Sequence, residues 1–222
     1  MNYNSKKYAH STILSSWFEK YLFGAVQKYL DVRKGEMVLE VGCNRGSVVK
    51  RMQELGATVY GIDINAEAIT DGIADNLQVM DATDLKFPDA MFDKAYSLHT
   101  VEHIPDVKKA IEEMERVLKP SGKLVLTYPT EPEFLRGFFC LYHAVVVYKN
   151  PFFARKIHVH SLNPKKIRKL VKDTNLQYLQ TPFFAVPFYP QYLTVLQKKA
   201  SSAFLKPKEK ISRPLAASLT NL

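Results

Sequence analysis

Cysteine is scarce in this 222-residue chain, and no obvious segment directs it to or through a membrane. Cys43 and Cys140 are its two cysteines, too few for the disulfide framework of a small secreted domain. The first ten residues are polar and lack the apolar core of a signal peptide. These absences predict a chain that works in a reducing, cytoplasmic setting.

A long uninterrupted hydrophobic run is also missing. The stretch 130–160 is crowded with aromatic and aliphatic residues, but Arg136, His143 and Lys149 interrupt it, which makes it a poor transmembrane span. Two interpretations stay open. The stretch is either a helical lid over an apolar substrate pocket or an element that dips into a membrane interface.

The charge of the chain is uneven. Residues 1–129 hold 16 Lys and Arg against 18 Asp and Glu, whereas residues 130–222 hold 15 against 4. The whole excess of positive charge, +9 in total, therefore lies in the last two-fifths. A basic region favours anionic partners such as phospholipid headgroups, phosphorylated substrates or nucleic acid, although a basic surface without a partner fits equally well.

Short apolar strands alternate with helical patterns from residue 36 onward. An amphipathic helix over 11–30 comes first, and the spacing then predicts strands at 36–42, 58–64, 77–81, 92–98 and 123–128. Helices are expected at 46–55, 65–74 and 107–118, a turn at 119–122, a helix after Asn163-Pro164, and strands near 177–184 and 192–197. This alternation predicts an α/β fold with a parallel sheet covered on both faces.

Polar residues end the predicted strands. Glu40 and the turn from Gly42 to Gly46 follow the first strand, Asp63 the second and Asp81 the third. In a doubly wound sheet, ligands bind at these carboxyl ends. Asp63 is placed to accept hydrogen bonds from two ribose hydroxyls, although an aspartate in this position also commonly caps a helix.

A dinucleotide-binding domain is a competing interpretation. Its G-x-G-x-x-G fingerprint is absent, because the run here is Gly42-Cys43-Asn44-Arg45-Gly46. The shorter turn suits a ligand without a pyrophosphate.

The motifs between residues 36 and 129 resemble those of the class I S-adenosylmethionine-dependent methyltransferases. The likeness runs through Val38–Gly46, Tyr60–Ile64, Met80–Pro88, Phe92–Ser97, Val101–Asp106 and Arg116–Leu124, with a weaker echo from His160 to Leu176. The nearest subgroup looks like the small-molecule and lipid methyltransferases, including the quinone-biosynthesis O-methyltransferases. The resemblance implies a Rossmann-like, doubly wound sheet of seven strands, mostly parallel with an antiparallel last strand.

The resemblance also implies the parts of a site for S-adenosyl-L-methionine. Glu40 and the turn of Gly42, Cys43, Asn44 and Gly46 would hold the methionine moiety, and Asp63 would bind the ribose. Ile64 would pack on the adenine, whose edge Asp81 and Ala82 would read. Leu98 and His99 would line the site beside the transferred methyl group. Asn44 departs from the family pattern by replacing a glycine, but asparagine tolerates the left-handed conformation better than most residues.

Methyl transfer by displacement at a sulfonium needs alignment and exclusion of water, and it needs a base where the acceptor carries a proton. His99 and His103 are the candidate bases, although His103 would equally well brace the following helix. Two adjacent side chains, Glu102 and His103, are weak evidence for a metal ion, and none is expected. His158 and His160 share a side of an extended segment, where a structural role is favoured.

The predicted organisation is an N-terminal helical cap at 1–35, a methyltransferase domain at 36–200 with the lid inserted at 130–160, and a basic, mobile tail at 201–222. The expected acceptor is a small molecule that is apolar, lipid-like or anionic, with peripheral contact of the protein to an anionic membrane. Two alternatives stay open: a nucleic-acid methyltransferase, which is less favoured because the Asn-Pro-Pro-Tyr type of tetrapeptide is absent, and a catalytically silent cofactor-binding partner protein.

Overall fold

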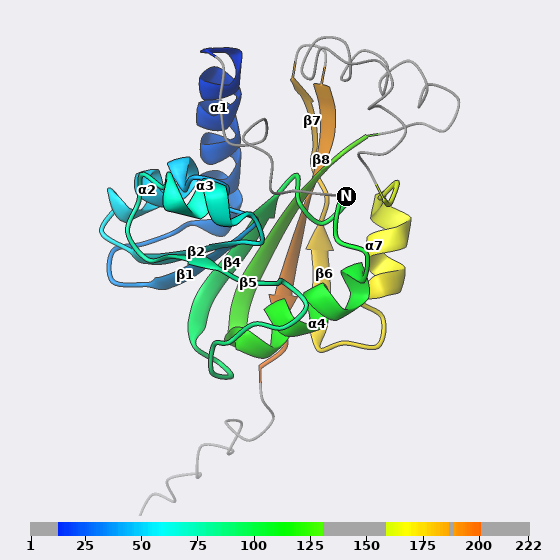
Figure 1. Ribbon diagram of the computed structural model, residues 1–222. Helices are drawn as coiled ribbons and strands as arrows, with labels where there is room; N and C mark the ends of the chain where they lie inside the picture. The colour runs from blue at the N-terminus through cyan, green and yellow to red at the C-terminus, as the bar shows by residue number, and fades with distance from the viewer. Residues whose placement is uncertain (1–12, 131–158, 187–188, 201–222) are drawn as a thin grey trace, which may run out of the picture.

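The protein folds as a mixed α/β sheet with helices on both faces (Figure 1). The structure is a computed structural model that describes residues 13–130, 159–186 and 189–200. The helices are α1 (Ile13–Leu30), α2 (Ser47–Gln53), α3 (Ala66–Thr70), α4 (Val107–Val117) and α7 (Pro164–Leu170). The strands are β1 (Met37–Val41), β2 (Thr58–Asp63), β3 (Leu77–Val79), β4 (Phe92–Leu98), β5 (Leu118–Pro129), β6 (Leu176–Gln180), β7 (Phe183–Val186) and β8 (Tyr189–Lys198).

The strand order is β3-β2-β1-β4-β5-β8-β6, with β7 also paired to β8. Strands β1 to β5 are parallel, and β8 runs antiparallel to β5, β6 and β7. The predicted Rossmann-like sheet is therefore confirmed. The order reverses between β1 and β4, which is where ligands bind in such sheets.

The expected strand at 177–184 is divided. Strands β6 and β7 occupy the same edge of β8, so eight strands fill seven positions in the sheet. The break falls at Thr181 and Pro182. Proline has no N–H to donate to a ladder, and the Pro182 carbonyl instead accepts a hydrogen bond from the Leu193 N–H at 3.1 Å.

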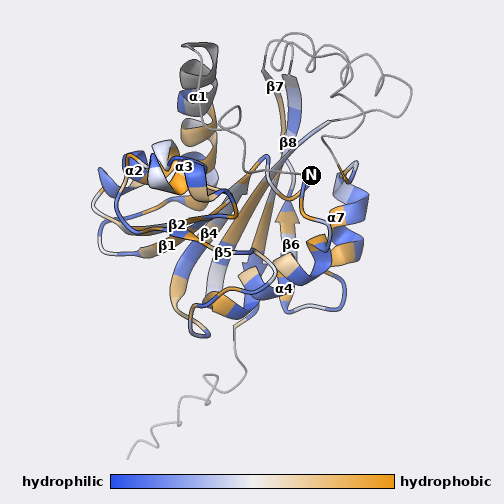
Figure 2. Cartoon of the chain, in the orientation of Figure 1, coloured by the Kyte–Doolittle hydropathy of each residue, from blue (hydrophilic) through white to orange (hydrophobic). Residues whose placement is uncertain are grey.

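Each face of the sheet has its own core. On one face, α1 and α2 bury Val26, Leu30, Val49 and Met52 against Val38 and Val125; on the other, α4 and α7 pack onto Leu39, Leu124 and Leu126. Figure 2 shows apolar colours along the central strands between these helices. Both faces of the central parallel strands are covered, so consecutive residues 38–41 of β1 and 94–97 of β4 are all buried.

The helix starts follow from local chemistry. Asn65 caps α3, Asp106 caps α4 and Asn163 caps α7, each through a side-chain oxygen that accepts from a backbone N–H. The expected helix at 65–74 is shorter than predicted, and the expected turn at 119–122 lies inside β5, where Ser121 has a φ of 66°. None of the described helices has the length and apolar character to cross a membrane.

Three sequence predictions fall outside the described residues, wholly or for the most part. These are the lid at 130–160, the tail at 201–222 and the side chain of His158. Helix α1, in the predicted cap at 1–35, packs on the sheet through Val26 and Leu30.

The turn after β1 passes very close to the loop after β4. Gly42 has a φ of 82°, and a Cβ added there would lie 2.0 Å from the Thr100 Oγ1. Thr100 in turn donates from Oγ1 to the Leu98 carbonyl at 3.0 Å. Position 42 therefore requires glycine for two reasons, its backbone conformation and the space that Thr100 fills.

Replacing Gly42 by alanine should cost more stability than the same change at Gly35. Gly35 has a φ of 85° with no atom within 4 Å of an added Cβ, so its variant suffers only the left-handed strain of roughly 1–2 kcal/mol. The Gly42→Ala variant adds a steric clash costing about 1–3 kcal/mol more. Urea unfolding of both variants measures the difference. Equal losses would mean that Thr100 moves aside freely.

Candidate functional site

The turn between β1 and α2 is built from residues in the left-handed conformation. Gly42, Asn44 and Gly46 have φ values of 82°, 51° and 78°. Asn44 thus adopts the backbone geometry that a glycine would adopt, so its presence in the motif leaves the shape of the turn intact. Gly46 is the N-cap of α2, and Val48, Val49 and Met52 of that helix are buried.

The N–H groups of this turn are bonded within the protein. Gly42 and Cys43 donate to the Ile62 carbonyl at 2.8 and 2.9 Å, and Asn44 donates to the Asp63 carboxylate at 2.8 Å. A pyrophosphate site needs such amides to point at the phosphate oxygens. This geometry argues against a dinucleotide and leaves a side-chain carboxylate as the main polar group facing the crevice.

Asp63 ends β2 and is fixed at both carboxylate oxygens. Its Oδ2 accepts from the Asn44 N–H, and its Oδ1 accepts from the Asn65 N–H at 2.9 Å. Burial raises the pKa of the Asp63 carboxyl, and the N–H donors of Asn65, Asn44 and Ile64 oppose that rise. Each oxygen retains a further lone pair, so the carboxylate can still accept from a diol.

Glu40 lies beneath the turn at the end of β1. The residue is 3% exposed, and its Oε2 accepts a hydrogen bond from the Tyr96 hydroxyl at 3.0 Å. Burial, followed by the Glu40 charge, raises the pKa of Tyr96 well above its ordinary value. The tyrosine therefore stays a donor that orients the carboxylate, a fitting partner for a ligand's ammonium group.

The Cys43 side chain points away from the crevice. It is buried, and burial raises the pKa of its thiol. A Cβ added to Gly61 on β2 would lie 2.9 Å from the Cys43 Sγ, so the thiol fills the space between the turn and β2. A contact between Cys43 and the cofactor stays a prediction. Because the thiol is buried, the backbone of Cys43 would have to make that contact.

The loop after β3 carries the residues predicted to read the adenine. Asp81 Oδ1 accepts from both the N–H and the Oγ1 of Thr83 at 2.8 Å, which shapes the turn that also holds Ala82. Two apolar side chains at neighbouring strand ends are exposed, Ile64 at 55% and Val79 at 54%. Such exposure suits a surface that a flat base covers, and Val79 was not predicted from the sequence.

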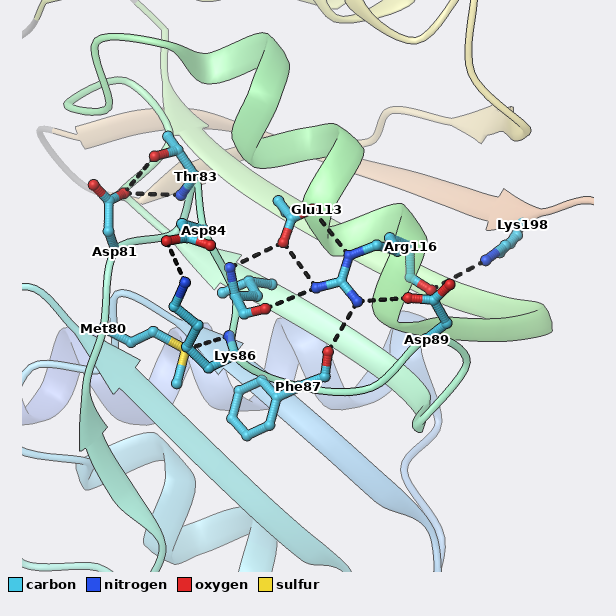
Figure 3. Close-up of polar contacts among 11 residues, drawn as sticks. Met80, Asp81, Thr83, Asp84, Lys86, Phe87, Asp89, Glu113, Arg116 and Lys198 are labelled. Atoms are coloured by element: carbon cyan, nitrogen blue, oxygen red, sulfur yellow. Dashed lines mark hydrogen bonds and ion pairs between the residues drawn. The ribbon is translucent and has the colours of Figure 1, made fainter.

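Arg116 at the end of α4 holds this loop in place (Figure 3). It donates to the Leu85 and Phe87 carbonyls at 2.8 and 2.9 Å and to the Asp89 carboxylate at 2.7 Å. Glu113 pairs with the same guanidinium and accepts from the Leu85 N–H at 2.9 Å. Together these bonds fix an otherwise irregular segment against α4.

His99 follows β4 with a φ of 50° and is enclosed by two other segments. Its Nε2 lies within hydrogen-bond distance of Gln191 Oε1 on β8, and its Nδ1 lies 3.6 Å from the buried Glu102 carboxylate. Both ring nitrogens therefore face protein groups. Leu98, immediately before it, is half-buried beside the same edge of the sheet.

His103 begins the approach to α4. Its backbone N–H donates to the Thr100 carbonyl at 2.9 Å, within the turn that also carries Glu102. Over residues 13–130, 159–186 and 189–200, no three His, Cys, Asp or Glu side chains lie close enough together to hold a metal ion. His160 donates from its backbone N–H to the Glu102 carbonyl, and its Nε2 lies 2.9 Å from the Pro105 carbonyl.

The structure brings Glu40, Asp63, Asn44 and His99 to one edge of the sheet, as predicted. Sequence reasoning missed Thr100, Arg116 and Gln191. Arg116 begins a motif stretch and Thr100 lies between two of them, but nothing in their spacing shows which backbone atoms they meet. Gln191 comes from the end of the chain, about 90 positions from His99, and no local pattern signals their contact.

Comparison with known proteins gives a family match. Residues 39–126 match the model of a methyltransferase domain. Among similar proteins, a ubiquinone biosynthesis O-methyltransferase from Paraburkholderia phymatum is 34% identical over 40% of this chain and 42% of its own. A demethylmenaquinone methyltransferase from Tropheryma whipplei is 33% identical over 53% and 52%, and a sterol 4-C-methyltransferase from Caenorhabditis elegans 29% identical over 46% and 33%. The matched segment thus spans from about a third to about half of these relatives.

Solved structures support the fold. A methyltransferase from Methanosarcina mazei superposes with a TM-score of 0.64 at 22% identity, covering 80% of this chain and 98% of its own. The [4+2]-cyclase SpnF superposes with a TM-score of 0.66 at 15% identity, covering 82% of each chain. The fold alone therefore does not fix the reaction. Residues 39–126, which contain the glycine-bearing turn and Asp63, are therefore similar to a methyltransferase domain in both sequence and fold.

Proposed function

We propose that this protein is an enzyme that transfers a methyl group from S-adenosylmethionine to a small, lipid-like acceptor. The observation that carries the proposal is the Asp63 carboxylate, held at the switch point by the Asn44 and Asn65 N–H groups and still able to accept from a ribose. Residues around Asp63 would hold S-adenosylmethionine, whose sulfonium would supply an electrophilic methyl group: the acceptor's nucleophile would bond to the methyl carbon as the carbon–sulfur bond breaks and S-adenosylhomocysteine leaves.

The residues around the turn divide the binding. Glu40, oriented by Tyr96, takes the ammonium of the methionine moiety, and the turn from Gly42 to Gly46 lets that moiety approach the backbone. Asp63 takes the ribose hydroxyls. Ile64 covers the adenine, while Asp81 and the Ala82 N–H read its edge.

The acceptor class is inferred from two kinds of support. The relatives named above methylate, according to their names, quinone precursors and a sterol. The chain itself places an aromatic-rich stretch at 130–160 next to a basic C-terminal region. Both features suit an apolar acceptor met at or near an anionic membrane.

His99 is the acid–base group of the proposal, and the Glu102 carboxylate lies 3.6 Å from its Nδ1, where it would stabilise a protonated ring. A hydroxyl acceptor has to give its proton to the His99 Nε2, and in the structure this nitrogen faces the Gln191 side chain. Gln191 therefore has to turn away from His99 when such an acceptor binds. His103 stays a second candidate base.

Changing Asp63 to Asn should weaken S-adenosylmethionine binding by about 10- to 100-fold at neutral pH, because a hydrogen-bonded charge is worth roughly 1.5–3 kcal/mol. Only the ionised carboxylate accepts from both hydroxyls. Since burial raises its pKa, wild-type affinity should fall on acidification at a pH above the ordinary aspartate value of about 3.9. The Asp63→Asn variant should lose this pH dependence.

Titration calorimetry over a pH series measures the cofactor affinity of both proteins. The control is Asp71→Asn, which makes the same charge change at an exposed position.

Release of S-adenosylhomocysteine in the presence of prenylated phenols and quinols then tests transfer. Wild type that does not bind the cofactor would contradict the proposal. Binding without any transfer across this panel would instead favour a silent cofactor-binding protein.

Changing Arg116 to Ala should reduce the discrimination between adenine and hypoxanthine at the cofactor site. The loop that carries Asp81 loses three of its anchors, so its contact with the exocyclic amine weakens. We expect affinities for S-adenosylhomocysteine and its inosine analogue to converge by about tenfold, the value of one hydrogen bond. The Lys86→Ala variant, which removes an exposed pair on the same loop, should keep the discrimination. Unchanged discrimination in Arg116→Ala would show that the loop holds its shape without the arginine.

Changing His99 to Asn should lower kcat/KM for a hydroxyl acceptor by about 10²- to 10⁴-fold, the usual worth of a positioned base, and should change cofactor affinity by a much smaller factor. Changing Gln191 to Ala exposes Nε2 and should leave the rate equal or higher. If both variants lose rate and stability alike, the pair only ties β4 to β8 and His99 is not the base.

A further inference from the structure

Helix α7 and the turn after it are densely basic. Residues 165–173 contain five positive charges and one negative charge, contributed by Lys165, Lys166, Arg168, Lys169, Lys172 and Asp173. All six side chains are exposed, while Ile167 and Val171 anchor the segment in the core. Figure 2 shows the hydrophilic character of this helix.

This charge is not neutralised locally. In the described part of the chain, none of these five cations forms an ion pair with a carboxylate. Lys166 donates from Nζ to the Ser161 carbonyl at 2.6 Å, and Arg168 lies over the Tyr178 ring at 4.1 Å. The other three lysines are left to interact with a partner.

An open hollow lies between this segment and the start of α4. Its volume is about 750 Å³, and four lysines line it: Lys108, Lys166, Lys169 and Lys172. The rest of the lining is apolar at Val107, Leu162 and Leu170 and polar at His160, Ser161 and the single carboxylate, Asp173. Val159, at the same hollow, is 49% exposed. Cations around an apolar floor match the headgroup and glycerol region of an anionic lipid.

The hollow adjoins the acceptor side of the site. His160, which lines it, donates to the Glu102 carbonyl at 3.0 Å, and Glu102 faces His99. Helices α4 and α7 also lie on the same face of the sheet, away from α1 and α2 (Figure 1). Whatever binds in the hollow is therefore one short loop away from the acceptor.

We propose that the α7 surface docks on an anionic membrane, with lipid phosphates in the hollow between α4 and α7. Docking in this orientation presents the acceptor side of the site to the bilayer, from which a lipid-like acceptor would enter. The apolar residues of the hollow favour a membrane over nucleic acid, because a phosphate backbone has no apolar groups that could pack on them. The reason for docking, delivery of a lipid-like acceptor, rests on the proposed function. The docking surface itself does not.

The test is the triple variant Lys166→Gln, Lys169→Gln and Lys172→Gln, assayed for partitioning onto vesicles of phosphatidylcholine with phosphatidylserine. Each lysine near an anionic surface contributes about 1 kcal/mol, and 1.4 kcal/mol is tenfold, so partitioning should fall on the order of 100-fold. The matched control changes Lys20, Lys28 and Lys50 to Gln on α1 and α2, where exposed lysines face elsewhere. The control should bind vesicles nearly as well as wild type.

Equal losses in both triple variants, or no loss in the α7 variant, would overturn the proposal. So would displacement of wild type from vesicles by duplex DNA together with tighter binding to that DNA, which would assign the surface to nucleic acid. Calorimetry with S-adenosylmethionine separates the two claims. Vesicle binding without cofactor binding would contradict the proposed function and leave the docking surface standing.

Discussion

The hydrogen bond from the Asn44 N–H to the Asp63 carboxylate is the constraint on which the site depends. It ties the turn after β1 to the end of β2, next to the point where the strand order reverses. The same bond orients Asp63 toward the crevice and holds Asn44 in a left-handed conformation. Gly42 completes the arrangement by leaving room for Thr100, so that the turn after β1 and the loop after β4 approach closely.

Much of this arrangement is readable from the sequence. Apolar runs that end in Glu40, Asp63 and Asp81 predict both the parallel strands and the polar edge, because strand periodicity and burial are local properties. Asn44 is predicted as a tolerated replacement for glycine, and its φ of 51° agrees. The expected absence of a metal ion, the roles of His99 and His103 as bases, and the roles of individual residues toward the cofactor stay predictions.

The rest depends on contacts between distant segments. Gln191 meets His99 only because β8 inserts antiparallel beside β5, and Arg116 meets the loop at 81–89 only because α4 packs across the sheet. The division of the edge strand into β6 and β7 reflects Pro182, which has no N–H. Its effect on strand pairing depends on whether that position would otherwise donate to the neighbouring strand. No spacing rule reveals such tertiary choices. Such contacts also place Glu102 beside His99 and, through the His160 N–H, beside the basic hollow at α7.

A crystal structure with S-adenosylhomocysteine bound would show whether Asp63 holds the cofactor. We expect the ribose hydroxyls to lie within hydrogen-bond distance of the Asp63 carboxylate, with the amino-acid end over the turn from Gly42 to Gly46. We also expect the Asn44–Asp63 hydrogen bond to be retained in the complex. A ligand bound away from Asp63, or a turn that breaks this bond to accommodate the ligand, would contradict the proposed role of Asp63.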